Sequence, residues 1–248
     1  MTAFPYTLTG PIGTRATLGL IVLQVDETIE HDFRRLFSAD DIALYISRIP
    51  SGDDLNPDTI NAMQETLPLA AGLLPPAAVF DVVGYGCTSG TTLIGADRVA
   101  ALVKSTANSR AVADPLTAAL SAMAALKATS VGIVSPYIEA VANPIRRAFE
   151  HAGFAVPATV SFGEQVEARV ARIDPASIHA AALAVGRQSD VDAVFLSCTN
   201  LRTLDIIDDL EQVLGKPVVS SNQALAWQMA RLAFLPQPLS APGRLFGT

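Results

Sequence analysis

The chain has few of the residues that build disulfide frameworks and metal centres. It contains two cysteines and three histidines among 248 residues. Two cysteines in a chain of this length do not make the disulfide framework of a small secreted domain. No histidine stands near either cysteine, so the usual spacing of zinc ligands is missing. We therefore expect neither a structural metal nor a cofactor held by such residues.

Positive charge and long apolar runs are also scarce. The 17 lysines and arginines are outnumbered by 24 acidic residues, which gives a net charge of −7. Nucleic acids and anionic membranes attract clustered basic residues, so the composition argues against both partners. Apolar runs such as 18–25 are much shorter than the roughly 20 residues of a membrane-spanning helix. The first residues lack the basic and apolar regions of a signal peptide. These absences predict a soluble cytoplasmic protein.

The two halves of the chain resemble each other. Residues 81–89 read Asp-Val-Val-Gly-Tyr-Gly-Cys-Thr-Ser, and residues 192–200 read Asp-Ala-Val-Phe-Leu-Ser-Cys-Thr-Asn. The two cysteines are therefore separated by 198 − 87 = 111 positions. Three further blocks match in the same order at similar offsets: 18–22 with 131–135, 33–37 with 145–149, and 56–60 with 174–178. Such order indicates a tandem duplication.

Short apolar runs rich in β-branched residues alternate with longer amphipathic stretches. This alternation is typical of buried parallel strands joined by helices. Asn56-Pro57 and Asp174-Pro175 each place a capping side chain before a proline at a helix start. The predicted strands are 18–23, 42–49, 79–83, 131–134, 155–161 and 193–196, with 110–114 and 216–221 as a fourth strand in each half.

The predicted fold class is α/β, with two similar doubly wound domains whose parallel four-stranded sheets are related by a pseudo-two-fold axis. The first domain comprises residues 1–114 plus 223–248, because a final helix at 224–233 would cross back over the first half. The second domain comprises residues 115–222. We expect the active site in the cleft between them, and a homodimer or higher homo-oligomer.

Cys87 and Cys198 each follow a predicted strand and precede a predicted helix. Ligands of open α/β sheets bind outside the carboxyl ends of the strands. A helix N-terminus behind each thiol would favour a thiolate and a bound carboxylate. One thiolate could then remove a proton from one face of a carbon while the opposite thiol delivers one to the other face.

Simpler interpretations of the two cysteines also exist. A free cysteine is often only a small buried hydrophobic residue, and a disulfide between Cys87 and Cys198 is conceivable outside a reducing compartment. The equivalent repeat positions, each followed by threonine, favour the catalytic interpretation. Hydroxyl and N–H groups of Thr88, Ser89, Thr199 and Asn200 would hold the carboxylate and the enediolate that develops from it.

Several motifs resemble those of the aspartate/glutamate racemase superfamily. Gly86-Cys87-Thr88-Ser89 resembles its first catalytic motif, and residues 197–201, Ser-Cys-Thr-Asn-Leu, resemble its second. Residues 217–224, Pro-Val-Val-Ser-Ser-Asn-Gln-Ala, are similar to the segment that follows. Within the superfamily the sequence is most similar to maleate isomerases, arylmalonate decarboxylases and ectoine-utilisation A proteins.

The resemblance implies roles for individual residues. Thr88, Ser89, Tyr137 and Cys198 match the residues that surround the substrate carboxylate in arylmalonate decarboxylases. The N–H groups of Thr199 and Asn200 would complete that pocket. Those decarboxylases have glycine at the position of Cys87, so the thiol here argues against simple decarboxylation. Tyr137 alone would otherwise be interpreted as a packing residue.

Asp26 departs from the maleate isomerase pattern, which has an asparagine that binds a substrate carboxylate after the first strand. A carboxylate at this position would repel a second substrate carboxylate. Asp26 could instead bind an ammonium group, adjust the acidity of Cys87, or only cap the following helix. The maleate isomerases also have an asparagine between the halves, for which residues 164–168, Glu-Gln-Val-Glu-Ala, offer no match.

These observations lead to one main hypothesis and two alternatives. The main hypothesis is a cofactor-independent racemase or epimerase that acts at the α-carbon of a small amino acid or derivative, in a role in ectoine breakdown. The first alternative is a maleate cis-trans isomerase with Cys87 as nucleophile and Cys198 as acid. The second is an arylmalonate-type decarboxylase. From another class, the chain would be a small-molecule binding protein without turnover.

Overall fold

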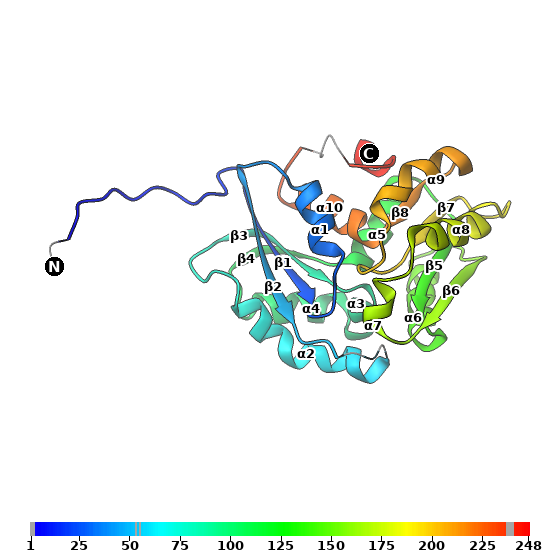
Figure 1. Ribbon diagram of the computed structural model, residues 1–248, viewed down its shortest axis with the longest axis horizontal. Coiled ribbons are helices and arrows are strands. Elements are labelled where there is room, and N and C mark those ends of the chain that lie inside the picture. The colour runs from blue at the N-terminus through cyan, green and yellow to red at the C-terminus, as the bar shows by residue number, and fades with distance from the viewer. Residues whose placement is uncertain (1–2, 53, 55, 237–240) are drawn as a thin grey trace.

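The structure is a computed structural model that describes residues 3–52, 54, 56–236 and 241–248. Two four-stranded parallel sheets, each with helices on its faces, lie side by side (Figure 1). This α/β architecture with one sheet in each half is the fold class that the sequence predicts. The strands are β1 (Ala16–Leu23), β2 (Ile42–Ile49), β3 (Phe80–Gly86), β4 (Ser109–Ala113), β5 (Val131–Tyr137), β6 (Thr159–Glu164), β7 (Ala193–Leu196) and β8 (Val218–Ser220).

The two sheets have equivalent strand orders, β2-β1-β3-β4 and β6-β5-β7-β8. In each sheet the chain first adds a strand on one side of the first strand and then returns to its other side. The first strand of each half is completely buried, as expected for a parallel sheet that helices cover on both faces. The order thus creates one reversal point per sheet, between β1 and β3 and between β5 and β7.

Helices connect consecutive strands, and capping side chains fix where several of them begin. Asn56 Oδ1 accepts hydrogen bonds from the N–H groups of Asp58 and Thr59 at the start of α2, and Asp174 caps α8 in the same way. Both predicted caps are confirmed. The α-helices are α1 (Ile29–Leu36), α2 (Pro57–Gly72), α3 (Thr88–Ile94), α4 (Ala96–Lys104), α5 (Pro115–Ala125), α6 (Glu139–His151), α7 (Glu167–Val170), α8 (Pro175–Gly186), α9 (Ile207–Leu214) and α10 (Ser221–Leu232).

Two strands are shorter in the structure than predicted. We predicted a strand at 155–161, but β6 begins only at Thr159. Pro157 lacks the N–H group that a sheet ladder needs, and before it only Ala155 forms an isolated bridge, to Ser130. The strand predicted at 216–221 is shorter in the structure, because the Ser220 side chain caps α10 by accepting from the Gln223 N–H.

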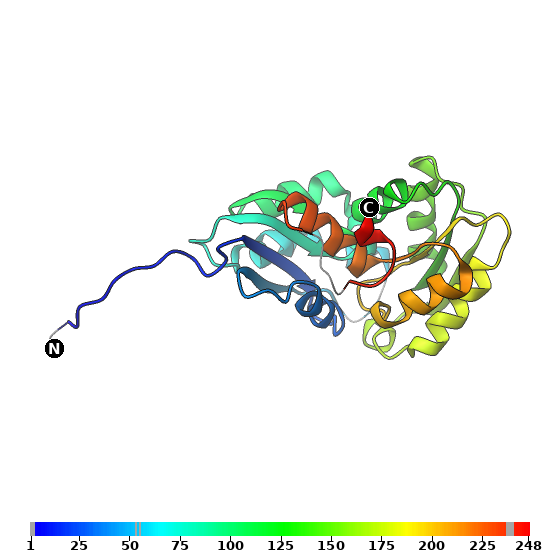
Figure 2. The same ribbon diagram turned by 90° about the horizontal axis from the view of Figure 1, so that it is seen from above.

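Helix α10 joins the two halves. It follows β8 of the second sheet yet packs against α1, α5 and β3 (Figure 2, orange-red). Through these contacts α10 brings the chain back to the first half. The domain limits near residues 114 and 222 stay predictions. At the other end of the chain, residues from Ala3 to Ile12 extend away from the body with Phe4, Tyr6 and Leu8 exposed.

Among the described residues, no helix combines the length and apolar character needed to cross a bilayer.

Candidate active site

The residues predicted to act lie at the reversal points of the two sheets. Asp26 follows β1 and Cys87 follows β3 in the first half, while Tyr137 ends β5 and Cys198 follows β7 in the second. The crevice outside such a reversal point is the usual ligand site of an open α/β sheet. Asp26 and Tyr137 both lie near the carboxyl end of the first strand of their half, but the strand offset of 131 − 18 = 113 aligns Tyr137 with Gln24 rather than with Asp26.

Cys87 is the N-cap residue of α3. Its Sγ accepts a hydrogen bond from the Gly90 N–H at 3.1 Å and lies 3.6 Å from the Ser89 hydroxyl. These contacts lower the pKa of the thiol, but burial outweighs them and raises it to about 11. The predicted helix N-terminus is thus present, and the thiolate that it was expected to favour stays a prediction.

Cys198 has a different setting. Its Sγ accepts from the Asn200 N–H at 3.3 Å, and its own N–H donates to the Ser221 hydroxyl at 3.0 Å. No helix begins here, contrary to the prediction, because Thr199 and Asn200 form a turn whose polar groups reach the first half. The backbone φ of +153° is one that a non-glycine residue seldom adopts, and such strain is concentrated at functional sites.

The charges of both thiols affect the pKa of Tyr137. The Cys198 thiol interacts with its hydroxyl, and burial first, then the charges of Cys198, Glu167 and Cys87, raise the Tyr137 pKa well above its ordinary value. The hydroxyl hydrogen bond in turn lowers the pKa of Cys198, although burial and the Glu167 carboxylate raise that pKa well above normal. Tyr137, both cysteines and Glu167 are therefore close enough to influence one another.

The four polar residues that follow the cysteines are all buried. The Thr88 hydroxyl lies 2.9 Å from that of Ser221, and the Thr199 hydroxyl donates to the Gly86 carbonyl oxygen at 3.2 Å. The Asn200 side chain accepts from the Glu27 N–H at 2.9 Å. These contacts cross between the halves, so Thr199 and Asn200 hold the interface in this state. Their predicted role in binding a carboxylate stays a prediction.

The two carboxyl oxygens of Asp26 have different surroundings. Its Oδ1 accepts from the N–H groups of Thr28 and Ile29, each at 2.8 Å, and so binds the first N–H group of α1, whose N-cap residue is Thr28. Its Oδ2 is buried and has no hydrogen-bond partner within the described chain. Burial raises the Asp26 pKa despite these contacts.

Glu167 is the residue that sequence reasoning missed. It begins the four-residue helix α7, is 3% exposed, and accepts from the Asn200 side-chain amide at 3.0 Å. Burial raises its pKa to about 7. In the sequence, residues 164–168 differ from the maleate isomerase pattern by lacking an asparagine. No local feature of this segment indicates that the Glu167 side chain is buried.

Ser221 and Asn222 are a second omission. The Asn222 side chain donates to the Thr199 carbonyl oxygen and to Asp32 Oδ2, each at 2.8 Å. Both residues therefore support the second cysteine's turn from the start of α10. The similarity of residues 217–224 to a superfamily segment is the signal that points to them, but their contacts become visible only in three dimensions.

The space at the thiols is small in this structure. A cavity of about 10 Å³ is lined by Cys87, Ser89 and Glu167 together with Leu23, Val25, Ser51, Gly52, Ile60 and Met63. It has room for about one water molecule. Asp54 forms an isolated antiparallel bridge with Val166, the residue before Glu167. The cavity at the thiols is therefore smaller in this structure than a small carboxylic acid.

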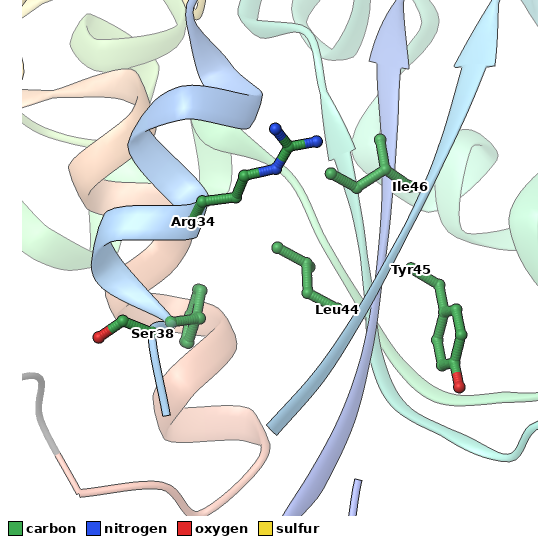
Figure 3. Close-up of a pocket in the computed structure, with 6 residues that line it drawn as sticks. Arg34, Ser38, Leu44, Tyr45 and Ile46 are labelled. Atoms are coloured by element: carbon green, nitrogen blue, oxygen red, sulfur yellow. The ribbon is translucent and has the colours of Figure 1, made fainter. Parts of the chain in front are cut away.

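Larger hollows lie elsewhere and lack the chemistry of the thiol site. One of about 520 Å³ lies between α1 and β2, where Arg34 and Leu44 face it (Figure 3). It contains none of the predicted site residues. Over the part of the chain that the structure describes, no three His, Cys, Asp or Glu side chains gather as metal ligands. Both cysteines are free thiols.

The comparisons with known proteins place the chain in a family. The sequence profile of the arylmalonate decarboxylase family matches residues 67–246, and these include both cysteines. The chain belongs to the arylmalonate decarboxylase family. It therefore falls within the aspartate/glutamate racemase superfamily, as its motifs indicated.

Individual relatives point to the same branch. The chain is 33% identical to arylmalonate decarboxylase of Bordetella bronchiseptica over 118 residues, which cover 47% of this chain and about half (49%) of that enzyme. It is 27% identical to a maleate isomerase of Pseudomonas putida over 176 residues, which cover 68% of this chain and 70% of that enzyme. These relatives favour the branch given as the alternative in the sequence analysis.

Solved structures share the fold over nearly the whole chain. The maleate isomerase Iso from Pseudomonas putida S16 superposes with a TM-score of 0.84 at 23% identity, covering 93% of this chain and 98% of that one. A double mutant of arylmalonate decarboxylase in a liganded form has a TM-score of 0.83 at 26% identity, with the same coverage. Two packed α/β halves are therefore common to these enzymes.

Proposed function

We propose that this chain is a cofactor-independent isomerase of small unsaturated carboxylic acids, related in mechanism to the maleate isomerases. The observation that carries the proposal is the pair of buried thiols at equivalent reversal points, each with a backbone N–H donor on its sulfur. Decarboxylation requires one proton donor, and a second thiol at Cys87 has no function in it. A reaction in which one sulfur adds to the substrate and leaves again while a second group transfers the proton needs two thiols.

The reaction starts with the Cys87 thiolate, formed by loss of its proton to solvent before the halves close. Its Sγ bonds to one carbon of the double bond, and the π-electron pair moves to the neighbouring carbon and its carbonyl group. Cys198 donates its thiol proton to that carbon. Rotation about the new single bond, return of the proton to Cys198 and cleavage of the carbon–sulfur bond give the trans acid.

Polar groups around the thiols support the charged intermediate. Thr88 and Ser89 lie beside Cys87, and the hydroxyl of Tyr137 lies beside Cys198. Hydrogen-bond donors aimed at developing negative charge are commonly the largest contribution to this kind of catalysis. We assign these three residues to the substrate carboxylate, with the Thr199 and Asn200 N–H groups as additional donors once the site opens.

Racemisation of a small amino acid or derivative is the second candidate. The buried carboxyls of Asp26 and Glu167 favour it, because they suit a substrate that carries an ammonium group. In this reaction one thiolate removes the α-proton and the opposite thiol delivers another. A role in ectoine breakdown belongs with this candidate.

One experiment separates the candidates. The purified protein is incubated in deuterated water with cis unsaturated acids, with amino acids and ectoine breakdown products, and with arylmalonates, and the products are followed by NMR. We expect trans acid without added metal or cofactor, and unchanged rates with a chelator. Deuterium at an α-carbon with loss of optical activity would instead establish racemisation, and release of carbon dioxide would contradict both isomerase candidates.

A further inference from the structure

The N-terminal arm, residues 4–12, has the side-chain pattern of a strand, although it pairs with no strand in the part of the chain that the structure describes. Its odd positions carry proline or threonine. Apart from Gly10, its even positions carry large apolar side chains, each at least 71% exposed: Phe4, Tyr6, Leu8 and Ile12. In an extended chain, residues two apart lie on the same face. The arm therefore has one continuous apolar face, which is typical of an interaction site.

The two prolines of the arm leave one of its backbone edges complete. The N–H groups of successive strand residues point to opposite edges, and proline has no N–H group. Pro5 and Pro11 both occupy odd positions, so every even position keeps its donor. Proline is tolerated in a strand where its nitrogen faces solvent. The backbone and the side chains thus select the same even-numbered residues for contact with another strand.

Strand β2 has an open edge that suits such an arm. It lies at the end of the first sheet, and among the described strands it pairs only with β1. Exposed edge strands commonly carry charges or prolines that prevent further pairing. The eight residues of β2 include no proline and one charged side chain, Arg48, which is already bound to Glu30. An edge of this length and apolar character favours the addition of a further strand.

The hollow of about 520 Å³ lies beside this edge. Leu44 and Ile46 point from β2 toward α1, whereas Tyr45 points to the opposite face (Figure 3). Helix α2 packs on that opposite face, where the Ser47 hydroxyl donates to the Ala70 carbonyl oxygen. On the α1 side, Leu44 and Ile46 stay partly exposed. The hollow therefore offers apolar surface directly beside the unpaired edge of β2.

We propose that the arm of one copy of the chain adds as a strand to the β2 edge of a second copy, with Phe4, Tyr6 and Leu8 in the hollow between β2 and α1. An extended segment of this length spans about 30 Å, enough to follow the whole of β2. Main-chain hydrogen bonds provide affinity in such strand addition, and the alternate side chains provide specificity. The arm contains no charged residue, so its burial removes no charge from water.

The exit of the arm favours a second copy as the partner. Gly13 lies tightly against the starts of both strands, because an added Cβ would overlap the Ala16 carbonyl oxygen and lie 2.9 Å from Ala43 Cβ. From this point the arm extends away from the body of its own chain (Figure 2). The arm and the β2 edge of one copy are therefore neighbours, so a single two-fold axis can bring both arms onto both edges. The product is a homodimer with exchanged arms.

Sedimentation of the full chain over a range of concentrations tests the interface. Wild type should form a dimer, and the triple variant Phe4→Ala, Tyr6→Ala, Leu8→Ala should be a monomer. Each apolar side chain that is removed should raise the dissociation constant of the dimer about tenfold or more. The far-UV circular dichroism should stay unchanged, because the arm lies outside the folded body. A monomer at every concentration of wild type, or a dimer that the triple variant leaves intact, would overturn the proposal.

Proline substitutions test the backbone pairing separately from apolar contact. Tyr6→Pro removes a donor from the pairing edge, and Thr7→Pro is the matched control because it removes one from the outer edge. Tyr6→Ala gives the effect of the side chain alone. Thr7→Pro should leave the dissociation constant unchanged, and Tyr6→Pro should weaken the dimer about fivefold or more beyond Tyr6→Ala. Equal effects of Tyr6→Pro and Thr7→Pro would contradict strand addition.

Disulfide trapping identifies which chain receives the arm. Both native thiols are buried, so a thiol added at the surface should react first. Oxidation of a mixture of Tyr6→Cys with Leu44→Cys or Ile46→Cys should link two chains, far more than oxidation of any of these variants alone. In the double variant Tyr6→Cys, Leu44→Cys, a disulfide within one monomeric chain would show that the arm folds back on its own β2. That result would overturn the exchange between copies.

Discussion

The two cysteines occupy equivalent positions of the duplicated fold, yet their surroundings differ. Cys87 caps a helix, and its sulfur accepts from the Gly90 N–H with the Ser89 hydroxyl nearby. Cys198 lies in a strained turn without a following helix, and the Glu167 charge raises its pKa second only to burial. Burial raises the pKa of both thiols, to about 11 for Cys87 and well above the normal range for Cys198.

This difference in surroundings favours a different chemical role for each thiol. A sulfur with helix N–H groups around it stabilises negative charge, whereas a sulfur beside a carboxylate retains its proton. In the proposed mechanism Cys87 is therefore the nucleophile and Cys198 the proton donor. The predictions below test this asymmetry.

The largest effect is expected from replacing either sulfur. Cys87→Ser and Cys198→Ser should each lower kcat by about 10³-fold or more, in the upper part of the range for loss of an acid–base or nucleophilic group. Mass spectrometry of the protein with substrate should detect a covalent adduct in Cys198→Ser but none in Cys87→Ser. An adduct on Cys198 in the Cys87→Ser variant would reverse the assignment of roles.

Glu167→Gln should affect both stability and the second thiol. The Glu167 carboxyl has a folded pKa of about 7 against an ordinary 4.5. Because the folded pKa is raised, the stability that the protonated form provides is present below about pH 4.5 and is lost as the pH rises through about 7. The full difference corresponds to about 3 kcal/mol.

Urea unfolding at several pH values measures this effect. Glu167→Gln should be more stable than wild type at about pH 8 and equal to it at about pH 4. The variant should also lower the pKa of Cys198 more than that of Cys87, since Glu167 is the second largest influence on the former and a minor one on the latter. Alkylation rates against pH report this. Equal pKa shifts at both thiols would show that Glu167 does not cause the difference between Cys87 and Cys198.

Gly90→Ala should produce a smaller effect that is confined to the first thiol. An added Cβ would lie 2.8 Å from the Cys87 sulfur and 2.6 Å from the Tyr85 hydroxyl oxygen. Overpacking of this kind costs about 1–3 kcal/mol. We expect slower alkylation of Cys87 and unchanged alkylation of Cys198. Gly10→Ala, where nothing lies within 4 Å of the added atom, is the control and should match wild type. An equal loss at both thiols would indicate general unfolding instead.

Much of the fold could be predicted because the repeat carries its information locally. The spacing of the cysteines, the apolar strand in front of each, and the Asn56 and Asp174 caps are all features of short segments. The errors arose where a local pattern is ambiguous. Residues 155–158 are apolar enough for a strand, but Pro157 has no N–H group to donate and Ala155 forms only an isolated bridge. Strand β6 therefore begins at Thr159.

The site was predicted less completely. The sequence allows several roles for Asp26, and the two carboxyl oxygens have different surroundings: Oδ1 accepts from N–H groups at the start of α1, and Oδ2 has no hydrogen-bond partner in the described residues. Glu167 could not be found, because its helix is four residues long and its inward direction depends on Asn200 from another segment. Oligomeric state and cellular location stay predictions.

The sequence by itself determined the duplication, the parallel α/β halves and the identity of the two thiols, since each depends on residues close together in the chain. Only the tertiary structure decided which carboxyls reach those thiols, and that both sulfurs are buried with raised pKa values. The physical reason is that acidity depends on the removal of water and on charges brought from distant segments. No local pattern records either of these.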